Sequence, residues 1–145
     1  MDFFDALHTS SSGLSAQRLR MNLISSNLAN INTTRTPQGG PYRRKDAVFE
    51  AIPAERSFKD TLAMAREGQI AEVKVAGIVE DPVPFKSKYD PHHPDADAQG
   101  YVKVPNINLM KEMVNMISAT RSYEANVSAI KAAKSMALKA LEIGR

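Results

Sequence analysis

The chain has 145 residues and a formal net charge of +3, with 43% hydrophobic and 24% charged residues. This balance is typical of a folded protein and excludes an intrinsically disordered one. Because cysteine is absent, the chain has no disulfide framework, no thiol nucleophile and no cysteine metal site. Basic residues form no dense stripe and aromatic residues reach only 6%, so the composition argues against binding to nucleic acid.

Membrane insertion and signal-directed secretion are both disfavoured by the sequence. No segment approaches the roughly 18 apolar residues that a membrane-spanning helix needs. A secretory signal peptide combines a positive start with about 7–15 apolar residues, whereas this chain begins with Asp2 and Asp5 and is polar from Thr9 to Ser12. We expect any export to proceed without a cleaved peptide of that kind.

The distribution of proline divides the chain into three parts. All eight prolines lie between Pro37 and Pro105. A proline inside a helix costs about 3 kcal/mol, so long helices are expected only in the proline-free flanks. The sequence therefore predicts an N-terminal helical part at 1–36, a central part rich in strands and turns at 37–105, and a C-terminal helical part at 106–145.

The N-terminal part predicts a helix from about Asp5 to Asn30. One set of positions alternates there at spacings of three and four, which is the periodicity of one helix face: Phe4, Leu7, Ser11, Leu14, Arg18, Met21, Ser25 and Leu28. Its apolar members include Leu14, Met21 and Leu28. The sequence SSSG at residues 10–13 consists of weak helix formers, so fraying is expected near the front of the helix.

Two polar groups, one at the end of this helix and one at residues 43–45, have two interpretations each. Asn27, Asn30 and Asn32 are expected to cap the last turn, where asparagine tolerates the left-handed conformation, and to meet a neighbouring subunit. A mark for export or recognition is the alternative. The triplet of Arg43, Arg44 and Lys45 is expected to be a solvated face, with contact to an acidic surface of an adjacent subunit as the alternative.

The central part predicts short strands joined by turns. Val73, Val75 and Val79 share the parity of a β-strand, and Gly77 among them indicates a bulge or a close approach of another segment. Shorter strands are expected at 47–52 and 101–104. Apolar residues between positions 56 and 67 have a helical spacing, which fits a short helix or an ordered excursion.

The turn at residues 89–100 gathers histidines and aspartates, which is typical of a metal site. A defined site needs ligands held at fixed geometry. Pro91 and Pro94 stiffen this segment, so the adjacent His92 and His93 cannot easily face one ion. We therefore expect a structural loop in which aspartates cap the turns, without a bound metal.

The C-terminal part predicts one long helix, started by Asn106 or Asn108 and ended by Gly144. One set of its residues follows alternating spacings of four and three, which is the heptad pattern of a coiled coil. This seam comprises Leu109, Met113, Met116, Thr120, Tyr123, Val127, Ile130, Lys134, Ala137 and Leu141. A second stripe of mostly small residues comprises Asn126, Ala129, Ala133, Met136, Ala140 and Ile143.

Such a helix would be about 58 Å long, whereas a compact chain of this size has a diameter of about 38 Å. The helix must therefore extend beyond any globule. We expect an α+β fold whose two terminal helices pair as an antiparallel-type coiled coil beside a small β-rich central region. The second stripe then remains to be covered by neighbouring copies of the chain or, as the alternative, by the central region.

The stretch SSNLANINT at residues 25–33, which ends the first helix, resembles the signature of bacterial flagellar axial proteins. In that family the terminal helices pair in the wall of a tube. The resemblance extends through GPYRRKDAVF at 40–49, YDPHHPDADAQGYVKVPNINLMKEMVNM at 89–116 and ATRSYEANVSAIKAAKSMALKALEIG at 119–144. It covers nearly the whole chain apart from about residues 54–69, which by this resemblance are a variable insertion. The longer matching segments are similar to those of proximal rod subunits.

The resemblance implies a non-enzymatic structural subunit of the proximal rod of the bacterial flagellar basal body. Its tube would transmit torque and pass exported subunits. The resemblance also implies export through the flagellar type III apparatus, assembly in the periplasm, and contacts with copies of the chain and with other rod proteins. No cofactor, small-molecule substrate or nucleic acid is expected as a partner.

Three alternatives to a rod subunit differ in what they require. A different axial protein of the same family is the nearest, although a hook or distal rod protein would carry a larger middle region. A soluble coiled-coil adaptor would form a discrete oligomer in solution. An enzyme is disfavoured, because the sequence shows neither a Ser-His-Asp constellation nor a phosphate-binding glycine loop.

The expected assembly interface draws on both terminal helices. Its residues are Leu14, Met21, Asn27, Leu28, Asn30, Met113, Met116, Tyr123, Val127, Ala129, Ile130, Ala133, Met136, Ala140 and Leu141. Within it, Ala129, Ala133 and Ala140 are expected to face an adjacent subunit, at a close contact that has no room for a larger side chain.

Overall fold

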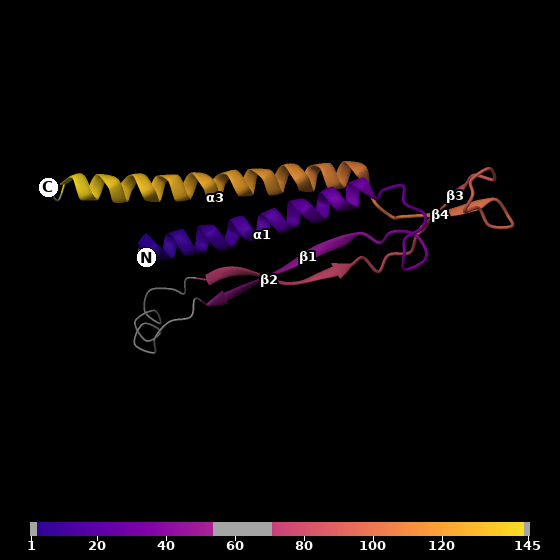
Figure 1. The fold of residues 1–145 in the computed structure, drawn as a ribbon, viewed down its shortest axis with the longest axis horizontal. Helices are drawn as coiled ribbons and strands as arrows, with labels where there is room; N and C mark the ends of the chain where they lie inside the picture. Colours follow the sequence, from indigo (N-terminus) through magenta and orange to yellow (C-terminus); the bar gives the residue numbers. More distant parts are fainter. Residues whose placement is uncertain (1–2, 54–70, 144–145) are drawn as a thin grey trace.

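A computed structural model describes residues 3–53 and 71–143 (Figure 1). The elements in chain order are α1 (Phe3–Ala29), β1 (Lys45–Pro53), β2 (Ala71–Glu80), β3 (Lys86–Tyr89), β4 (Tyr101–Val104) and α3 (Leu109–Ile143). The expected α+β fold with long terminal helices is confirmed. The insertion expected at 54–69, with its short helix, lies outside the described residues, as does Gly144.

The molecule is elongated, and α1 is its middle layer (Figure 1). The two helices run antiparallel, so that α1 begins and α3 ends at the same end of the molecule. The β1–β2 hairpin packs on the other side of α1, whereas α3 packs against α1 alone among the described elements. The small β3–β4 sheet lies at the far end. One side of α3 is therefore covered within the chain.

Helix α1 is continuous through residues 10–13, so the expected fraying is not found. The weak helix formers there make contacts instead. The Ser12 hydroxyl donates to the carbonyl oxygen of Thr9 at 2.9 Å and accepts from the amide of Val73 in β2 at 3.1 Å. A side chain at Gly13 would begin 3.0 Å from the amide nitrogen of Asn126 in α3. Tertiary contacts on both sides of α1 thus outweigh its weak local propensity.

Two antiparallel strand pairs form the central part. In β1–β2 the pairing runs from Lys45 opposite Glu80 to Pro53 opposite Ala71, and it shifts register beside Gly77. The strands expected at 47–52 and 101–104 and the expected bulge are therefore confirmed. Strand β3, with the sequence KSKY, was not predicted from the sequence, because a short run with two lysines carries no strand signal.

Asn108 starts α3, as one of the two expected caps. Its side-chain oxygen accepts from the amide of Lys111 at 3.2 Å. The helix then runs for 35 residues, or about 52 Å, against about 40 Å for the 27 residues of α1. The last turns of α3 therefore extend beyond the start of α1 (Figure 1). Few apolar side chains are buried in the core of the described chain: Ala16, Ile24, Val102, Ile107, Ala119 and Ala133.

Candidate functional site: the helix pair and its outward face

The two helices hold one register along their contact. Near one end Asn27 lies beside Glu112, and about four turns away Gly13 lies beside Asn126. Both pairs of residue numbers add to 139, so each step along α1 matches one step back along α3. Extrapolated by the same sum, this register pairs position 6 with Ala133.

The contact surface of α3 is rotated by one residue from the expected seam. Its most buried positions follow a spacing of seven, with Glu112 1%, Ala119 0% and Ala133 5% exposed and Asn126 half-buried. The expected residue Met113 is instead 47% exposed, which corrects that assignment. Small residues at these positions allow the two backbones to approach closely, and a row of larger side chains would hold them apart.

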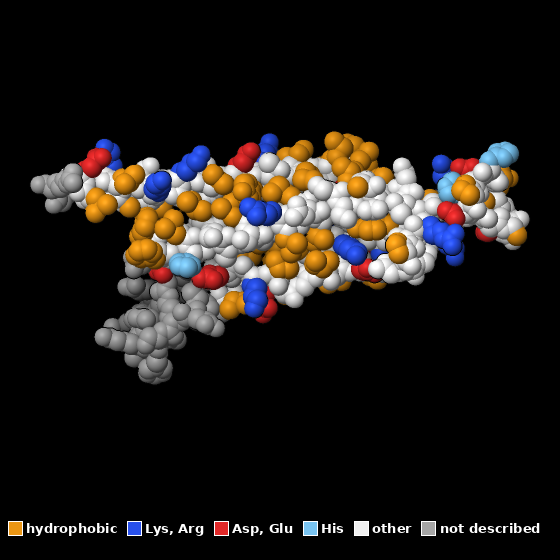
Figure 2. Space-filling view, in the orientation of Figure 1, with side chains coloured by type: hydrophobic (Ala, Val, Ile, Leu, Met, Phe, Trp, Pro, Cys, Tyr) orange, Lys and Arg blue, Asp and Glu red, His pale blue; other side chains and the backbone are white. Residues whose placement is uncertain are grey.

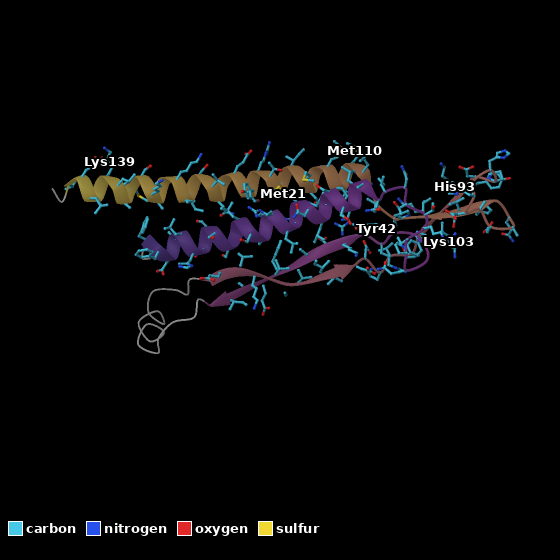
Figure 3. The ribbon with its side chains drawn as sticks, in the orientation of Figure 1. Met21, Tyr42, His93, Lys103, Met110 and Lys139 are labelled. Carbon is cyan, nitrogen blue, oxygen red and sulfur yellow. The ribbon has the colours of Figure 1, made fainter. Side chains whose placement is uncertain are left out.

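Four residues of the expected interface lie in the observed contact surface of α3 or directly beside it. Met116, Tyr123, Val127 and Ile130 are half-buried beside α1. On α1 the expected residues Leu14, Met21 and Leu28 are also half-buried, and the sulfur of Met21 accepts from the hydroxyl of Thr120 at 3.7 Å (Figure 3). These positions therefore contribute to the pairing of the helices within one chain.

The stripe expected to face a neighbouring subunit is divided by the structure. Ala133 is buried against α1, so its expected position on an outer surface is corrected. Ala129 and Ala140 are exposed, as are Met136 at 67% and Leu141 at 71%. The reason is geometric, because position 133 belongs to the seven-residue series that contains Glu112 and Ala119 and that faces α1.

A buried polar junction joins the end of α1, the segment before β1 and the start of α3. The side chain of Asn27 is fully buried. Its amide nitrogen donates to the carbonyl oxygen of Lys45 at 2.8 Å and to Glu112 at 3.3 Å. Its oxygen accepts from the amide of Lys45 at 2.9 Å and from the hydroxyl of Tyr42 at 3.1 Å (Figure 3). All four hydrogen-bonding positions of this amide are thus satisfied.

Arg44 completes this junction with an ion pair. Its Nε donates to Glu112 Oε1 at 2.8 Å, and the guanidinium also reaches Asp46 at 3.0 Å. Burial lowers the pKa of the Arg44 guanidinium, but the hydrogen bonds and charges of Glu112 and Asp46 outweigh this effect and raise that pKa above its ordinary value. Glu112 is the member of the junction that α3 supplies.

The basic triplet therefore has a role that neither sequence interpretation gave. Arg44 is 14% exposed and paired within the chain, and Arg43 lies 4.6 Å from the centre of the Phe85 ring and donates to the carbonyl oxygen of Asp81. The solvated-face interpretation is wrong for Arg44. The sequence gave no signal for the junction, because the partners Asn27 and Glu112 are 85 residues apart.

Asn30 caps the end of α1 as expected, but by a different conformation. Its side-chain nitrogen donates to the carbonyl oxygen of Ser26 at 2.9 Å, and its oxygen accepts from the hydroxyl of Thr33 at 3.1 Å. Within residues 3–53 and 71–143, only glycines have a positive φ. The expectation of a left-handed asparagine is therefore wrong, and the local capping role is confirmed.

The outward side of α3 carries large apolar side chains. The apolar α3 face lies over the first turns of the helix, on the side away from α1, and Figure 2 shows it as a concentration of hydrophobic surface. Its residues, all at least 47% exposed, are Leu109, Met110, Met113, Val114 and Ile117. Met110 points away from the rest of the molecule in Figure 3. Exposed apolar patches of this kind mark interaction surfaces.

The loop at 89–100 is held by its own polar side chains. Asp97 Oδ1 accepts from the amides of Gln99 and Tyr101, each at 2.9 Å, which confirms that an aspartate caps a turn. Asp95 accepts from the hydroxyl of Thr34 at 2.7 Å, and His93 accepts from the amide of Asp95. Among the described residues, no three histidine or acidic side chains are gathered as metal ligands would be.

Comparison with known proteins gives full-length relatives. Residues 7–35 match the family described as "Flagella basal body rod protein", and residues 98–143 match the one described as "Flagellar basal body rod FlgEFG protein C-terminal". The chain is 48% identical to the flagellar basal-body rod protein FlgC of Bacillus subtilis, with 100% of both chains covered. It is 46% identical to FlgC of Borreliella burgdorferi, covering 99% of this chain and 98% of the relative. For FlgC of Salmonella typhimurium the identity is 44% over 92% of each chain. Neither helix in the described part is long and apolar enough to cross a membrane.

Proposed function

The chain belongs to the FlgC family of flagellar basal-body rod proteins and is a structural subunit of the rod, and we propose that it builds the proximal rod as part of a tube that transmits torque and passes exported subunits. Its partners in this proposal are copies of itself and other rod proteins, after export through the flagellar type III apparatus into the periplasm. No catalytic step is part of the proposal. Coiled-coil winding of the helix pair belongs to it, supported by the seven-residue repeat of the contact.

The observation that carries this proposal is the contrast between the two sides of α3. The side that contacts α1 is buried, whereas the apolar α3 face has no covering element among the described residues. A subunit wall offers such a face the burial that the single chain lacks. Burying one large apolar side chain is worth about 1.5–3 kcal/mol, so several of them supply a strong contact between neighbours.

Charge placed on the apolar α3 face tests the proposal. Ile117→Glu puts a carboxylate at a position that is 53% exposed in the single chain, so the fold should persist. In an assembled rod the same carboxylate would be buried without a partner, which is strongly unfavourable. We expect cells that carry only this variant to contain the protein but to lack completed basal bodies and motility, as seen by immunoblot, electron microscopy and swimming assays.

Ser122→Glu is the matched control. Ser122 lies five residues after Ile117, so it is turned by about 140° around the helix, away from the apolar α3 face, and its hydroxyl donates to the carbonyl oxygen of Ser118 at 3.0 Å in an exposed setting. This variant should assemble and swim. Normal basal bodies with Ile117→Glu would show that the apolar α3 face stays in solvent, and the proposed wall contact would then be abandoned.

A further inference from the structure

The small residues of the helix pair do not define a single register. On α3 the contact positions Ala119, Asn126 and Ala133 repeat every seven residues, and on α1 Gly13 lies in the matching series. A shift of α3 by one heptad would place Gly13 opposite Ala133, which is again a contact between small residues. Packing alone therefore distinguishes these two registers poorly.

The polar junction distinguishes them. In the shifted register Asn27 would face Ala119, which has no group to accept its hydrogen bond. Glu112 would leave Arg44 and Asn27, so the ion pair at 2.8 Å and the hydrogen bond at 3.3 Å would both be lost. The rest of the junction is unaffected by such a shift, because Asn27 remains bonded to Lys45 and Tyr42.

We propose that Glu112, held by Arg44 and Asn27, is a register lock that fixes how far α3 extends past α1. The position of Glu112 at the first turn of α3 sets the whole length of the helix beyond it, including the end that projects past the start of α1 (Figure 1). A single buried polar group commonly specifies register in paired helices in this way.

Cysteine pairs can report the register, because the chain has no cysteine of its own. Gly13→Cys with Asn126→Cys reports the observed register, and Gly13→Cys with Ala133→Cys reports the shifted one. The two partner positions are about 10.5 Å apart along α3, whereas a disulfide needs Cα atoms within about 7 Å, so one register cannot satisfy both pairs. The readout is the fraction of full-length chain that is cross-linked, on non-reducing gels.

The lock is removed by Arg44→Met together with Glu112→Leu, which leaves no unpaired charge in the junction. In this background we expect cross-linking of the shifted pair to rise about tenfold over the unaltered chain, which corresponds to about 1.4 kcal/mol of register preference. Tyr42→Phe is the control, because it removes a bond to Asn27 without touching α3, and it should leave both pairs unchanged.

Moving the lock is the sharper test. Glu112→Ala with Ala119→Glu places the carboxylate one heptad along α3, where it meets Asn27 and Arg44 only in the shifted register. We expect the shifted pair to become the dominant cross-link in this variant. Helical circular dichroism is measured on every variant.

Three results would overturn the register lock. One is a shifted pair that stays at its baseline in both the removed and the moved backgrounds. The second is loss of helix content in Arg44→Met with Glu112→Leu, since apolar replacements should leave a register device folded. The third is an altered cross-linking pattern in Tyr42→Phe, which would attribute the register to general packing around Asn27.

Discussion

The two sides of α3 reverse the usual arrangement of a helix in a globular protein. The centre of its contact with α1 is made of small and polar residues such as Ala119, Ala133 and Glu112, with larger side chains half-buried at the margins, while Met110 and Val114 stand 68% and 62% exposed on the opposite side. In a globular protein such large apolar side chains would face inward. The difference teaches that the centre of the inner contact supplies close fit and specificity, and that the first turns of α3 leave further apolar surface available for burial.

Removing the Arg44–Glu112 ion pair on the inner side of α3 should have the largest effect on the stability of the chain. Arg44→Met leaves Glu112 buried without its cation. We expect the free energy of unfolding to fall by about 3–5 kcal/mol, because an uncompensated buried charge costs more than an ordinary lost contact. Urea denaturation followed by circular dichroism measures this change.

An exposed ion pair provides the comparison for that measurement. Lys139 and Glu142 lie 2.7 Å apart at the solvent-facing end of α3, and both side chains are mostly exposed (Figure 3). Lys139→Met should change the free energy of unfolding by less than about 0.5 kcal/mol. Equal effects for the two variants would mean that the Arg44–Glu112 pair behaves as a surface pair, contrary to its burial.

Two alanines on α3 allow the inner contact and the outer surface to be compared, with an expected loss of unfolding free energy of intermediate size. Ala133→Leu overfills the contact with α1, and we expect it to lower the free energy of unfolding by about 1–3 kcal/mol. Ala129→Leu introduces the same side chain at an exposed position, where the change should stay within about 0.5 kcal/mol. Thermal or urea unfolding of the two purified chains decides between an inner and an outer location for each alanine, and equal losses would contradict the rotation of the seam.

The smallest effect on the single chain is expected on the apolar α3 face. Met110→Gln replaces a side chain that is 68% exposed by a polar one of similar length and similar helix propensity. Its free energy of unfolding should stay within about 0.5 kcal/mol of the unaltered chain in the same urea experiment. A loss comparable to that of Ala133→Leu would show that this face is already packed within the subunit, and the comparison between the two sides of α3 would collapse.

The sequence predicted the elements well because their signals are local. The absence of proline, the three-four spacing of apolar residues and the cap at Asn108 indicated both helices, and β-branched alternation indicated the strands. Strand β3 was missed because lysines dominate it. The helix through Ser10–Gly13 was predicted, but the contacts of Ser12 with β2 and of Gly13 with α3 that support this weak stretch were not, because they come from distant parts of the chain.

By itself, then, the sequence determined that two long helices form, that they flank a small β-rich region, and that α3 is too long to be enclosed by its own chain. Only the tertiary structure decided which of two heptad series, one residue apart, turns toward α1. Spacing cannot choose between them, because Met113 and Glu112 begin equally regular repeats. The choice depends on partners 85 and 68 residues away, Asn27 and Arg44, which favour burial of Glu112, and on the close approach that Gly13, Ala119 and Ala133 permit.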